Sequence, residues 1–323
     1  MPNMRFVVLS IVLLIWADSI VAQNYPISSH YMFNPQVVNP SFYGARKGVN
    51  LGVNYRHQWA KLEGQPLTIT VFGDANLPQL HGGVGFGVSY EQLGAFTTTG
   101  FNLGYAYTQE FRKQVRLSIG CNAGALFSTL DGSKLVTPQG VGANLNDASL
   151  SNQQQKSIRP LLSVGISCSS KYLEAGLVYT NVINAKDKFE GSQMTLKPQY
   201  GGTLQVFIGS KVKLGSDFSI KPGFALTTDF KEFQTDISVL AGYKEYVMLG
   251  FNARGYNKRS FESLSPILRV CPVQNLAIIY GYDVSLGKLS NVNKGSHEIT
   301  LNYVLPNNRI FKSPRIINNP RFL

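Results

Sequence analysis

The sequence is poor in charge and has few long apolar runs. Asp, Glu, Lys and Arg together make up 15% of its 323 residues, whereas soluble domains carry about 25%. Beyond the N-terminus, no apolar stretch reaches the length that a membrane helix needs. Hydrophobic residues still make up 44%, so the chain has enough apolar material to fold and disorder is excluded.

Cysteine and histidine are also scarce. The spacing of the three cysteines, Cys121, Cys168 and Cys271, fits neither a metal site nor a framework of several disulfides. The sequence does not decide whether two of them form a single disulfide. None of the four histidines pairs at a metal-binding spacing, and there is no nucleophile elbow. The glycine-rich run at residues 83–87 does not lead into a helix, which excludes a dinucleotide site. We therefore expect no catalytic residues, no cofactor and no metal.

Positive charge exceeds negative charge, with a formal net charge of +12. Nucleic acid is the usual partner of such a chain. However, no basic cluster lies on an expected helix, and no nucleic-acid-binding module is recognisable. The excess of positive charge fits a secreted or membrane protein that meets anionic lipid or an acidic partner better than it fits a nucleic-acid-binding protein.

The N-terminus has the features of a secretory signal peptide. Arg5 precedes an apolar run at residues 6–17, and Ala22 supplies a small residue at the expected cleavage point. The run is too short to cross a bilayer as a helix. We assign residues 1–22 to the signal peptide and expect the mature chain to begin at Gln23.

Apolar residues alternate with small or polar residues along most of the mature chain. In residues 83–90 and 298–305, every second residue is large and apolar, which is the period of a β-strand. About fourteen segments show this pattern, and most are longer than the average soluble strand. They cover residues 48–58, 67–76, 82–91, 97–110, 114–127, 157–169, 171–180, 199–209, 216–228, 233–243, 245–256, 262–270, 273–286 and 296–305.

The connections between these segments alternate in length. The longest, at 128–156 and 181–198, are odd-numbered, whereas the even-numbered ones, such as 111–113 and 271–272, are tight. Long external loops, short periplasmic turns and an even number of strands are typical of outer-membrane barrels. The sequence therefore predicts an all-β fold: a transmembrane antiparallel β-barrel over residues 48–305 in the outer membrane.

The two faces of the strands suit such a barrel. The apolar face would meet lipid, and tyrosines near strand ends would lie at the membrane interfaces. The opposite face is small and polar, with few full charges. The charges expected to point inward include Arg116, Asp236, Arg254 and Asp283.

Two segments lie outside the barrel strands. Residues 23–47 contain aromatic residues around two Asn-Pro steps, which fix turns, and we expect a short plug-like or rim segment. Residues 306–323 form a basic tail that we expect in the periplasm. Its basic residues are Arg309, Lys312, Arg315 and Arg321.

Several motifs resemble the PorP/SprF family, outer-membrane proteins of the type IX secretion and gliding motility machinery of Bacteroidetes. Residues 31–35 (YMFNP) and 39–44 (NPSFYG) are similar to the opening signature of that family. Residues 55–59, 83–88 and 296–299 are similar to its later blocks. The resemblance covers essentially the whole mature chain. The tail is a departure, because many outer-membrane barrels end on their last strand.

The resemblance implies a non-enzymatic accessory of type IX protein secretion. Its expected partners are a secreted cargo protein, recognised through its C-terminal domain, and periplasmic subunits of the machine. Arg56 and Trp59 lie at the external end of the first strand. In one interpretation Arg56 is a charge of the lumen or a loop and Trp59 is an aromatic residue of the rim. In the other, both residues pack against the N-terminal segment or the cargo. The residues that we single out for the plug or for partner binding are Tyr31, Met32, Phe33, Asn34, Pro35, Asn39, Pro40, Tyr43, Arg56 and Trp59.

Three other functions remain open from the sequence. A passive channel or transporter for small solutes would have the same strand pattern. A lipid-modifying barrel enzyme would need a site assembled across strands, for example around His297, but His297 and Glu298 point to opposite faces of a strand. The strands of a soluble β-sandwich would also alternate apolar and polar residues. However, a sandwich gives no reason for the long loops to be the odd-numbered ones and the short turns the even-numbered ones.

Overall fold

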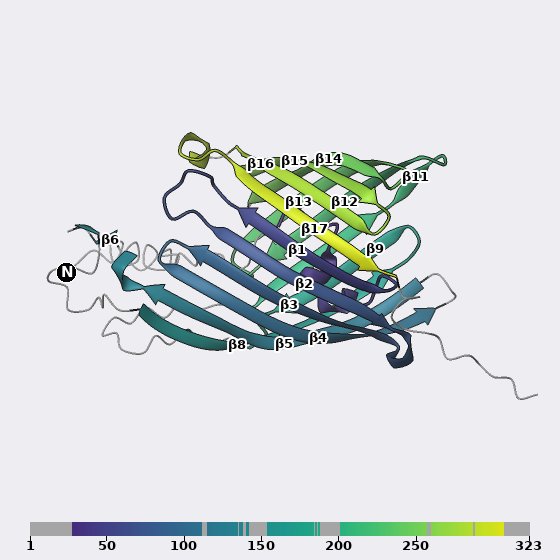
Figure 1. Cartoon of the computed structure of the whole chain (residues 1–323), viewed down its shortest axis with the longest axis horizontal. Coiled ribbons are helices and arrows are strands. Elements are labelled where there is room, and N and C mark those ends of the chain that lie inside the picture. Colours follow the sequence, from purple (N-terminus) through teal and green to yellow (C-terminus); the bar gives the residue numbers. More distant parts are fainter. Residues whose placement is uncertain are drawn as a thin grey trace, which may run out of the picture.

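The fold is a closed antiparallel β-barrel with fourteen strands around its wall (Figure 1). It is a computed structural model that describes residues 28–111, 115–134, 136–137, 140–141, 154–183, 185, 187, 201–256, 260–286 and 288–306. Among these residues, no helix is long and apolar enough to cross a membrane. The signal peptide, the tail and residues 23–27 of the N-terminal segment lie outside the described residues.

The wall strands follow one another in chain order. They are β1 (Val49–His57), β2 (Leu67–Leu77), β3 (Gly82–Leu93), β4 (Phe96–Phe111), β5 (Val115–Asp131), β8 (Gln154–Ser169), β9 (Leu173–Thr180), β10 (Thr203–Ser210), β12 (Phe218–Thr228), β13 (Phe233–Tyr243), β14 (Val247–Tyr256), β15 (Ser260–Val273), β16 (Leu276–Ser285) and β17 (Ser296–Leu305). A short strand β11 (Val212–Leu214) extends the hairpin before β12, and β6 (Val136–Thr137) pairs with β7 (Gly140–Val141).

Pairing of the first and last strands closes the barrel. β1 lies antiparallel to β17, with Val49 opposite Leu305 and His57 opposite His297. Because each of the fourteen wall strands has two neighbours, the described wall has no long open edge that could pair with another chain. The fourteen strands match the segments expected from period-two alternation, and β13 and β17 match them residue for residue.

The strand boundaries differ from expectation by three residues or more in three places. β15 continues to Val273, so the turn lies at 274–275 rather than 271–272. The ladder shifts register between Val270 and Val273, and such an irregularity tolerates Pro272, which the sequence places in the turn. β5 and β8 extend to the pair Asp131 and Gln154, which shortens the connection expected at 128–156. β10 begins at Thr203 rather than at 199.

The two ends of the barrel differ in their connections. The four longest connections, at 58–66, 132–153, 181–202 and 286–295, all leave from one end, which we call the long-loop end. Turns at 78–81, 170–172, 244–246 and 274–275 lie at the other, which we call the short-turn end. In Figure 1 the long-loop end is on the left. The predicted sorting of loop lengths by parity is therefore confirmed.

Alternation sorts the side chains onto two faces. Large apolar residues such as Leu103, Ile119 and Phe251 are exposed on the outer face, where hydrocarbon would cover them. Inward-facing residues are small or polar, and Ser265 and Asn252 are fully buried. Asp236, Arg254 and Asp283, which we expected to point inward, are also buried there.

The structure also places four of the tyrosines expected at the interfaces and shows the state of the three cysteines. Tyr90, Tyr107, Tyr243 and Tyr303 are exposed, as expected for interfacial residues. Cys121, Cys168 and Cys271 are free thiols. No disulfide therefore joins the three positions.

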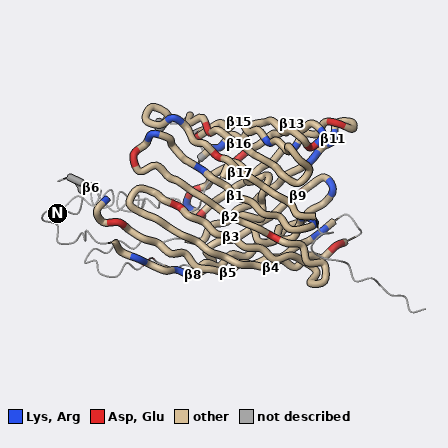
Figure 2. Tube along the Cα trace, in the orientation of Figure 1, with Lys and Arg blue, Asp and Glu red and all other residues tan. Residues whose placement is uncertain are grey.

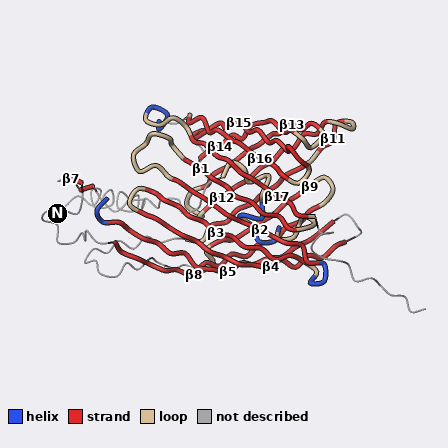
Figure 3. Tube along the Cα trace, viewed as in Figure 1, coloured by secondary structure: helices blue, strands red, loops and turns tan. Residues whose placement is uncertain are grey.

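Inside the wall lies a segment without strands, residues 28–47, which we call the inner segment. It contains two short 3₁₀ turns, η1 (Pro35–Val37) and η2 (Pro40–Phe42), which Figure 3 shows within the envelope of the strands. Further 3₁₀ turns are η3 (Pro78–Leu80), η4 (Gly132–Lys134) and η5 (Lys288–Asn291). The inner segment supplies four of the six buried phenylalanine and tyrosine side chains of the described residues, Tyr31, Phe33, Phe42 and Tyr43.

Candidate functional site

The two Asn-Pro steps shape the inner segment. Pro35 and Pro40 each occupy the first position of a 3₁₀ turn, where a fixed φ and the missing N–H are tolerated. Asn39 caps the second turn, because its side chain accepts a hydrogen bond from the backbone N–H of Ser41 at 3.0 Å. Asn34 accepts a hydrogen bond from Asn302 of β17 at 2.6 Å, so the first turn is tied directly to the wall.

The second turn lies close against β5, β8 and β9. The Asn39 side chain donates to the carbonyl of Leu177 at 3.2 Å, and Ser167 donates to the carbonyl of Ser41 at 3.3 Å. A methyl group at Gly120 would lie 2.6 Å from the backbone of Pro40. Only glycine allows such a close approach of two backbones.

Tyr43 and Gly44 hold the next part of the inner segment against β2, β4 and β5. The Tyr43 hydroxyl lies within 3.4 Å of the side chains of Asn102 and Asn122. The backbone N–H of Gly44 donates to the Asp74 carboxylate at 2.9 Å. This contact brings the chain to the short-turn end, where β1 begins.

Aromatic residues of the inner segment form two buried clusters with wall strands other than β5, β8 and β9. Tyr31 and Phe42 pack on Phe207 and Ala225 of β10 and β12, with both aromatic pairs edge to face. Phe33 packs with Ile267 and three other wall residues, and Met32 lies between the two clusters. Contacts of the inner segment thus fall on strands around the circumference of the lumen.

Five buried charged residues of the wall form the lumen ion cluster: Arg56, Asp236, Arg254, Asp283 and Glu298. Arg56 Nη2 lies 2.5 Å from Asp283 Oδ2, and its Nη1 lies 2.7 Å from Glu298 Oε2. Arg254 Nε lies 2.9 Å from Asp236 Oδ1, and its Nη1 lies 3.5 Å from Asp283 Oδ2. One network therefore joins β1, β13, β14, β16 and β17.

The beginning of the inner segment is bound to this cluster. Ser28 Oγ donates to Glu298 at 2.6 Å, and the Ser29 backbone N–H donates to the other carboxylate oxygen at 2.8 Å. Ser29 Oγ also donates to Asp283 at 2.9 Å and accepts from Arg254 at 3.1 Å. The charges of the cluster therefore hold the inner segment as well as the wall.

His30 follows in a fully enclosed position. Its Nδ1 lies 2.8 Å from Thr300 Oγ1, whereas Nε2 has no hydrogen-bond partner among the described residues. Burial lowers the pKa of His30 below its ordinary value of 6.5; Glu298 and Asp283 oppose this shift, and Arg56 adds to it. The ring is therefore harder to protonate when the segment is in place than it would be in water.

Arg56 and Trp59 lie at the long-loop end of β1, as their position in the sequence suggests. Arg56 is 2% exposed and points into the lumen, where it holds the inner segment through Glu298 and Asp283. Trp59 is half-buried beyond the strand, and its backbone N–H donates to Ser296 Oγ at 3.1 Å. His297 lies on the opposite face from Glu298, with its Nδ1 2.9 Å from the Tyr280 hydroxyl.

Sequence reasoning missed Glu298 and residues 28–30. Arg56 and Glu298 are direct cross-strand partners in the ladder that closes the barrel. The sequence signal for this ion pair was the presence of two inward-facing charges of opposite sign, one on the first strand and one on the last. That signal has meaning only once the register between these two strands is known.

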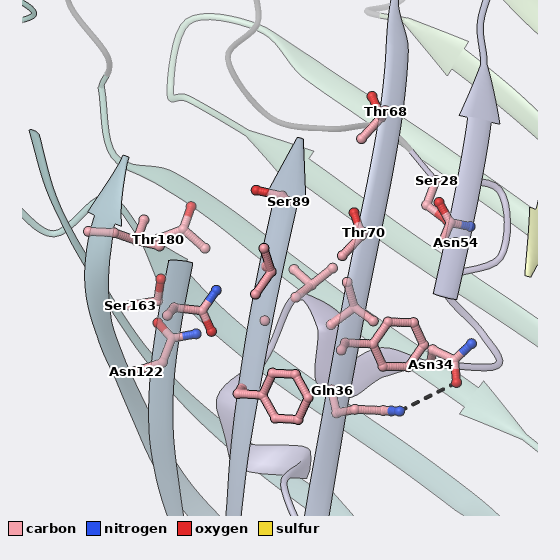
Figure 4. A pocket seen from close by; sticks show the side chains of 18 of the residues that line it. Ser28, Asn34, Gln36, Asn54, Thr68, Thr70, Ser89, Asn122, Ser163 and Thr180 are labelled. Atoms are coloured by element: carbon pink, nitrogen blue, oxygen red, sulfur yellow. Dashed lines mark hydrogen bonds between the residues drawn. The ribbon is translucent and has the colours of Figure 1, made fainter. Parts of the chain in front are cut away.

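A cavity opens above the inner segment toward the long-loop end (Figure 4). The empty space between its walls is about 1350 Å³, including the part that is open to solvent. Its rim carries Thr68, Arg159 and Thr180 near the loop-bearing ends of β2, β8 and β9, and Gln36 of the inner segment lines it. Polar side chains from several strands point into it in Figure 4. The inner segment therefore turns this half of the lumen into a pocket.

Among the residues that the structure describes, no group of three His, Cys, Asp or Glu side chains could hold a metal ion. Arg309, Lys312, Arg315 and Arg321 lie outside the described residues, as does most of the loop at 132–153.

An apolar outer belt, a closed wall of fourteen strands and a polar lumen define an outer-membrane β-barrel. The chain matches the family model of the type IX secretion system membrane protein PorP/SprF over residues 20–303. It therefore belongs to the PorP/SprF family of the type IX secretion system, a family of secretion membrane proteins rather than of known enzymes.

Solved structures of other outer-membrane proteins are similar to this chain at very low identity. The toluene transporter TodX of P. putida has a TM-score of 0.50 and 7% identity, covering 88% of this chain and 96% of that one. Omp33 of Acinetobacter baumannii has a TM-score of 0.47 and 7% identity, covering 81% and 100%. A FadL homologue of Pseudomonas aeruginosa has a TM-score of 0.47 and 10% identity, covering 87% and 95%. No curated protein matches the sequence.

Proposed function

We propose that this outer-membrane protein is a docking component of type IX secretion. It holds the C-terminal domain of a secreted surface protein at its long-loop end, and thereby helps to deliver or retain that protein. The observation that carries the proposal is the inner segment, which is bound to strands around the lumen and leaves a pocket on the long-loop side. In outer-membrane barrels the longer loops face outward, so the pocket would face the cell surface.

The same observation counts against a passive channel. A solute would have to pass Tyr31, Phe42 and Tyr43, each of which is less than 10% exposed. The buried ion pairs that hold Ser29 would also have to break, which leaves charges without partners in a region that water does not reach. The fold that the chain shares with a toluene transporter does not by itself bring that activity to this lumen.

The pocket suits a protein segment better than a charged small molecule. Hydroxyl and amide side chains, among them Thr70, Ser89, Asn122 and Ser163, point into it beside apolar residues such as Phe86 and Leu161. Such a lining offers hydrogen bonds and apolar contact to a loop or strand edge of a docked domain. Periplasmic subunits of the machine would meet the opposite, short-turn end.

Affinity purification tests the proposal. Tagged protein is purified from detergent-solubilised outer membranes after crosslinking, and the proteins that come with it are identified by mass spectrometry. We expect a large secreted protein with a type IX C-terminal domain. A clean barrel with neither cargo nor machine subunits would contradict the proposal and make solute transport the next function to test.

Two neighbouring variants localise the contact. Ser163 is buried and faces the pocket, whereas Val164 is 40% exposed on the outer face. Ser163→Trp would fill part of the pocket, so cargo recovery should fall, while Val164→Trp places the same side chain in lipid and should leave recovery unchanged. Equal recovery with both variants would contradict docking at the pocket.

A further inference from the structure

Basic residues gather at the short-turn end of the lumen. Arg116, Lys221 and Arg269 occupy inward-facing positions of β5, β12 and β15, and Arg46 belongs to the inner segment. Lys211 lies between β10 and β11. Figure 2 shows Lys and Arg positions gathered near β9 and β11, with a few acidic positions among them. We call Arg46, Arg116, Lys211, Lys221 and Arg269 the basic mouth.

Four of these cations already have partners. Arg116 Nη1 donates to the carbonyl of Ala45 at 2.9 Å, and Arg46 donates to the carbonyl of Phe33. Lys211 pairs with the Glu245 carboxylate, and Arg269 Nη1 donates to the Glu245 carbonyl at 3.3 Å. Backbone carbonyls take up three of the four contacts, so Lys211 is the one of these four cations in an ion pair with a described carboxylate, while Asp74 and Glu174 also attract Arg46.

Lys221 is different, because its ammonium has neither a hydrogen bond nor an ion pair with any described residue. It is half-buried on the lumen side of β12. Lys211, Arg269 and Arg46 repel its charge, and Glu245 is the carboxylate near enough to attract it. A charge held in such a position favours the binding of an anion.

A cavity lies beside this lysine. It is lined by Lys171, Lys211 and Lys221 together with Met32 and Phe207, and Glu174 is its one carboxylate among the described residues. The empty space is about 610 Å³, including the part that is open to solvent. The cavity thus combines three ammonium groups with an apolar floor supplied partly by the inner segment.

We propose that the basic mouth binds an acidic segment of a partner protein that approaches from the short-turn end. Placing this partner in the periplasm rests on the orientation adopted under Proposed function, but the binding chemistry does not. The chain's own tail does not fit as the occupant, because residues 306–323 include four basic residues and no acidic residue. Lipid headgroups do not fit either, because Arg116, Lys221 and Arg269 occupy lumen-facing positions of their strands.

The test uses the full-length protein in detergent and an oligo-glutamate peptide with a fluorescent label. Fluorescence anisotropy at low salt should show saturable binding that weakens as salt is added, and an oligo-lysine peptide should not bind. The double variant Lys221→Gln, Arg269→Gln should bind roughly tenfold more weakly, the scale of two partly screened ion pairs.

The matched control is Lys294→Gln, an exposed lysine at the long-loop end. We expect it to bind the oligo-glutamate like the unmodified protein. Equal weakening in the control would show diffuse charge attraction and overturn the site, as would unchanged binding by the double variant or no saturable binding at low salt. Heat-dependent mobility on gels confirms that each variant is folded. This peptide assay does not involve cargo, so its failure is distinct from failure of the proposed docking function.

Discussion

At the scale of single residues, the wall and the inner segment are joined by charges that water does not reach. Arg56 and Arg254 face Asp236, Asp283 and Glu298, and all five are buried. Forming such a network costs free energy, because the charges must leave water. Breaking it also costs free energy, because removal of one partner leaves another charge buried alone. Asp283 holds the central place, since it contacts both arginines and Ser29.

Asp283→Asn should therefore destabilise the barrel by about 3 kcal/mol or more. The measurement is urea unfolding in detergent, followed by tryptophan fluorescence. Asp217→Asn is the matched control, because Asp217 pairs with Lys244 at 3.6 Å on the surface, with both side chains at least 40% exposed. The control should lose less than about 1 kcal/mol. Equal losses would show that the lumen ion cluster does not stabilise the fold.

His30 gives the inner segment a dependence on pH. The pKa of His30 in the docked segment is below 6.5, chiefly through burial, so the released segment takes up a proton more readily than the docked one. Docking is therefore strongest above pH 6.5 and weakens as the pH falls below it. Hydrogen exchange of residues 28–47, corrected for the intrinsic rate, should show faster opening at pH 5 than at pH 7.5.

The comparison for this effect is His30→Asn, which removes the titrating group. The difference in pH dependence between the unmodified protein and this variant isolates His30 from the nearby Glu298, Asp283 and Arg56. Identical pH dependence in the two proteins would mean that His30 does not control docking.

At the scale of elements, the inner segment fits the wall through close backbone contacts. Gly120 of β5 faces Pro40, and a methyl group there would lie 2.6 Å from the Pro40 backbone. Gly120→Ala should displace the second turn and make the chain around Arg46 and Lys47 accessible to trypsin. Limited proteolysis with N-terminal sequencing of the products measures this.

Gly201→Ala is the control for that experiment, since no atom lies within 4 Å of the added methyl group. We expect this variant to be cut no faster than the unmodified protein. If Gly120→Ala is also cut at the original rate, the inner segment does not depend on the close approach that the structure shows.

The elements differ in how far the sequence reveals them. Strand spans could be predicted because lipid on one side and a polar lumen on the other impose a strict period of two. The continuation of β15 through Pro272 could not, because proline normally ends a strand and the register shift that accommodates it depends on the neighbouring strand. The aromatic residues of 31–43 indicated burial, but not which strands would cover them.

At the scale of the whole molecule, the barrel is closed in two ways. Pairing of β1 with β17 closes the wall, and the inner segment occupies the lumen. The sequence could not reveal that the inner segment occupies the lumen, since contacts such as those of Ser29 with Asp283 and Arg254 join residues more than 200 positions apart. They exist only once the strand number and the register have fixed the width of the lumen.

The central claim is that the inner segment closes the lumen, so that the protein works by docking partners rather than by conducting solutes. Single-channel recording in planar lipid bilayers tests it most directly, with the unmodified protein compared with a variant that lacks residues 28–45. We expect no conductance steps from the unmodified protein and clear steps from the variant. Steps of equal size from both proteins would contradict the claim and favour a passive channel.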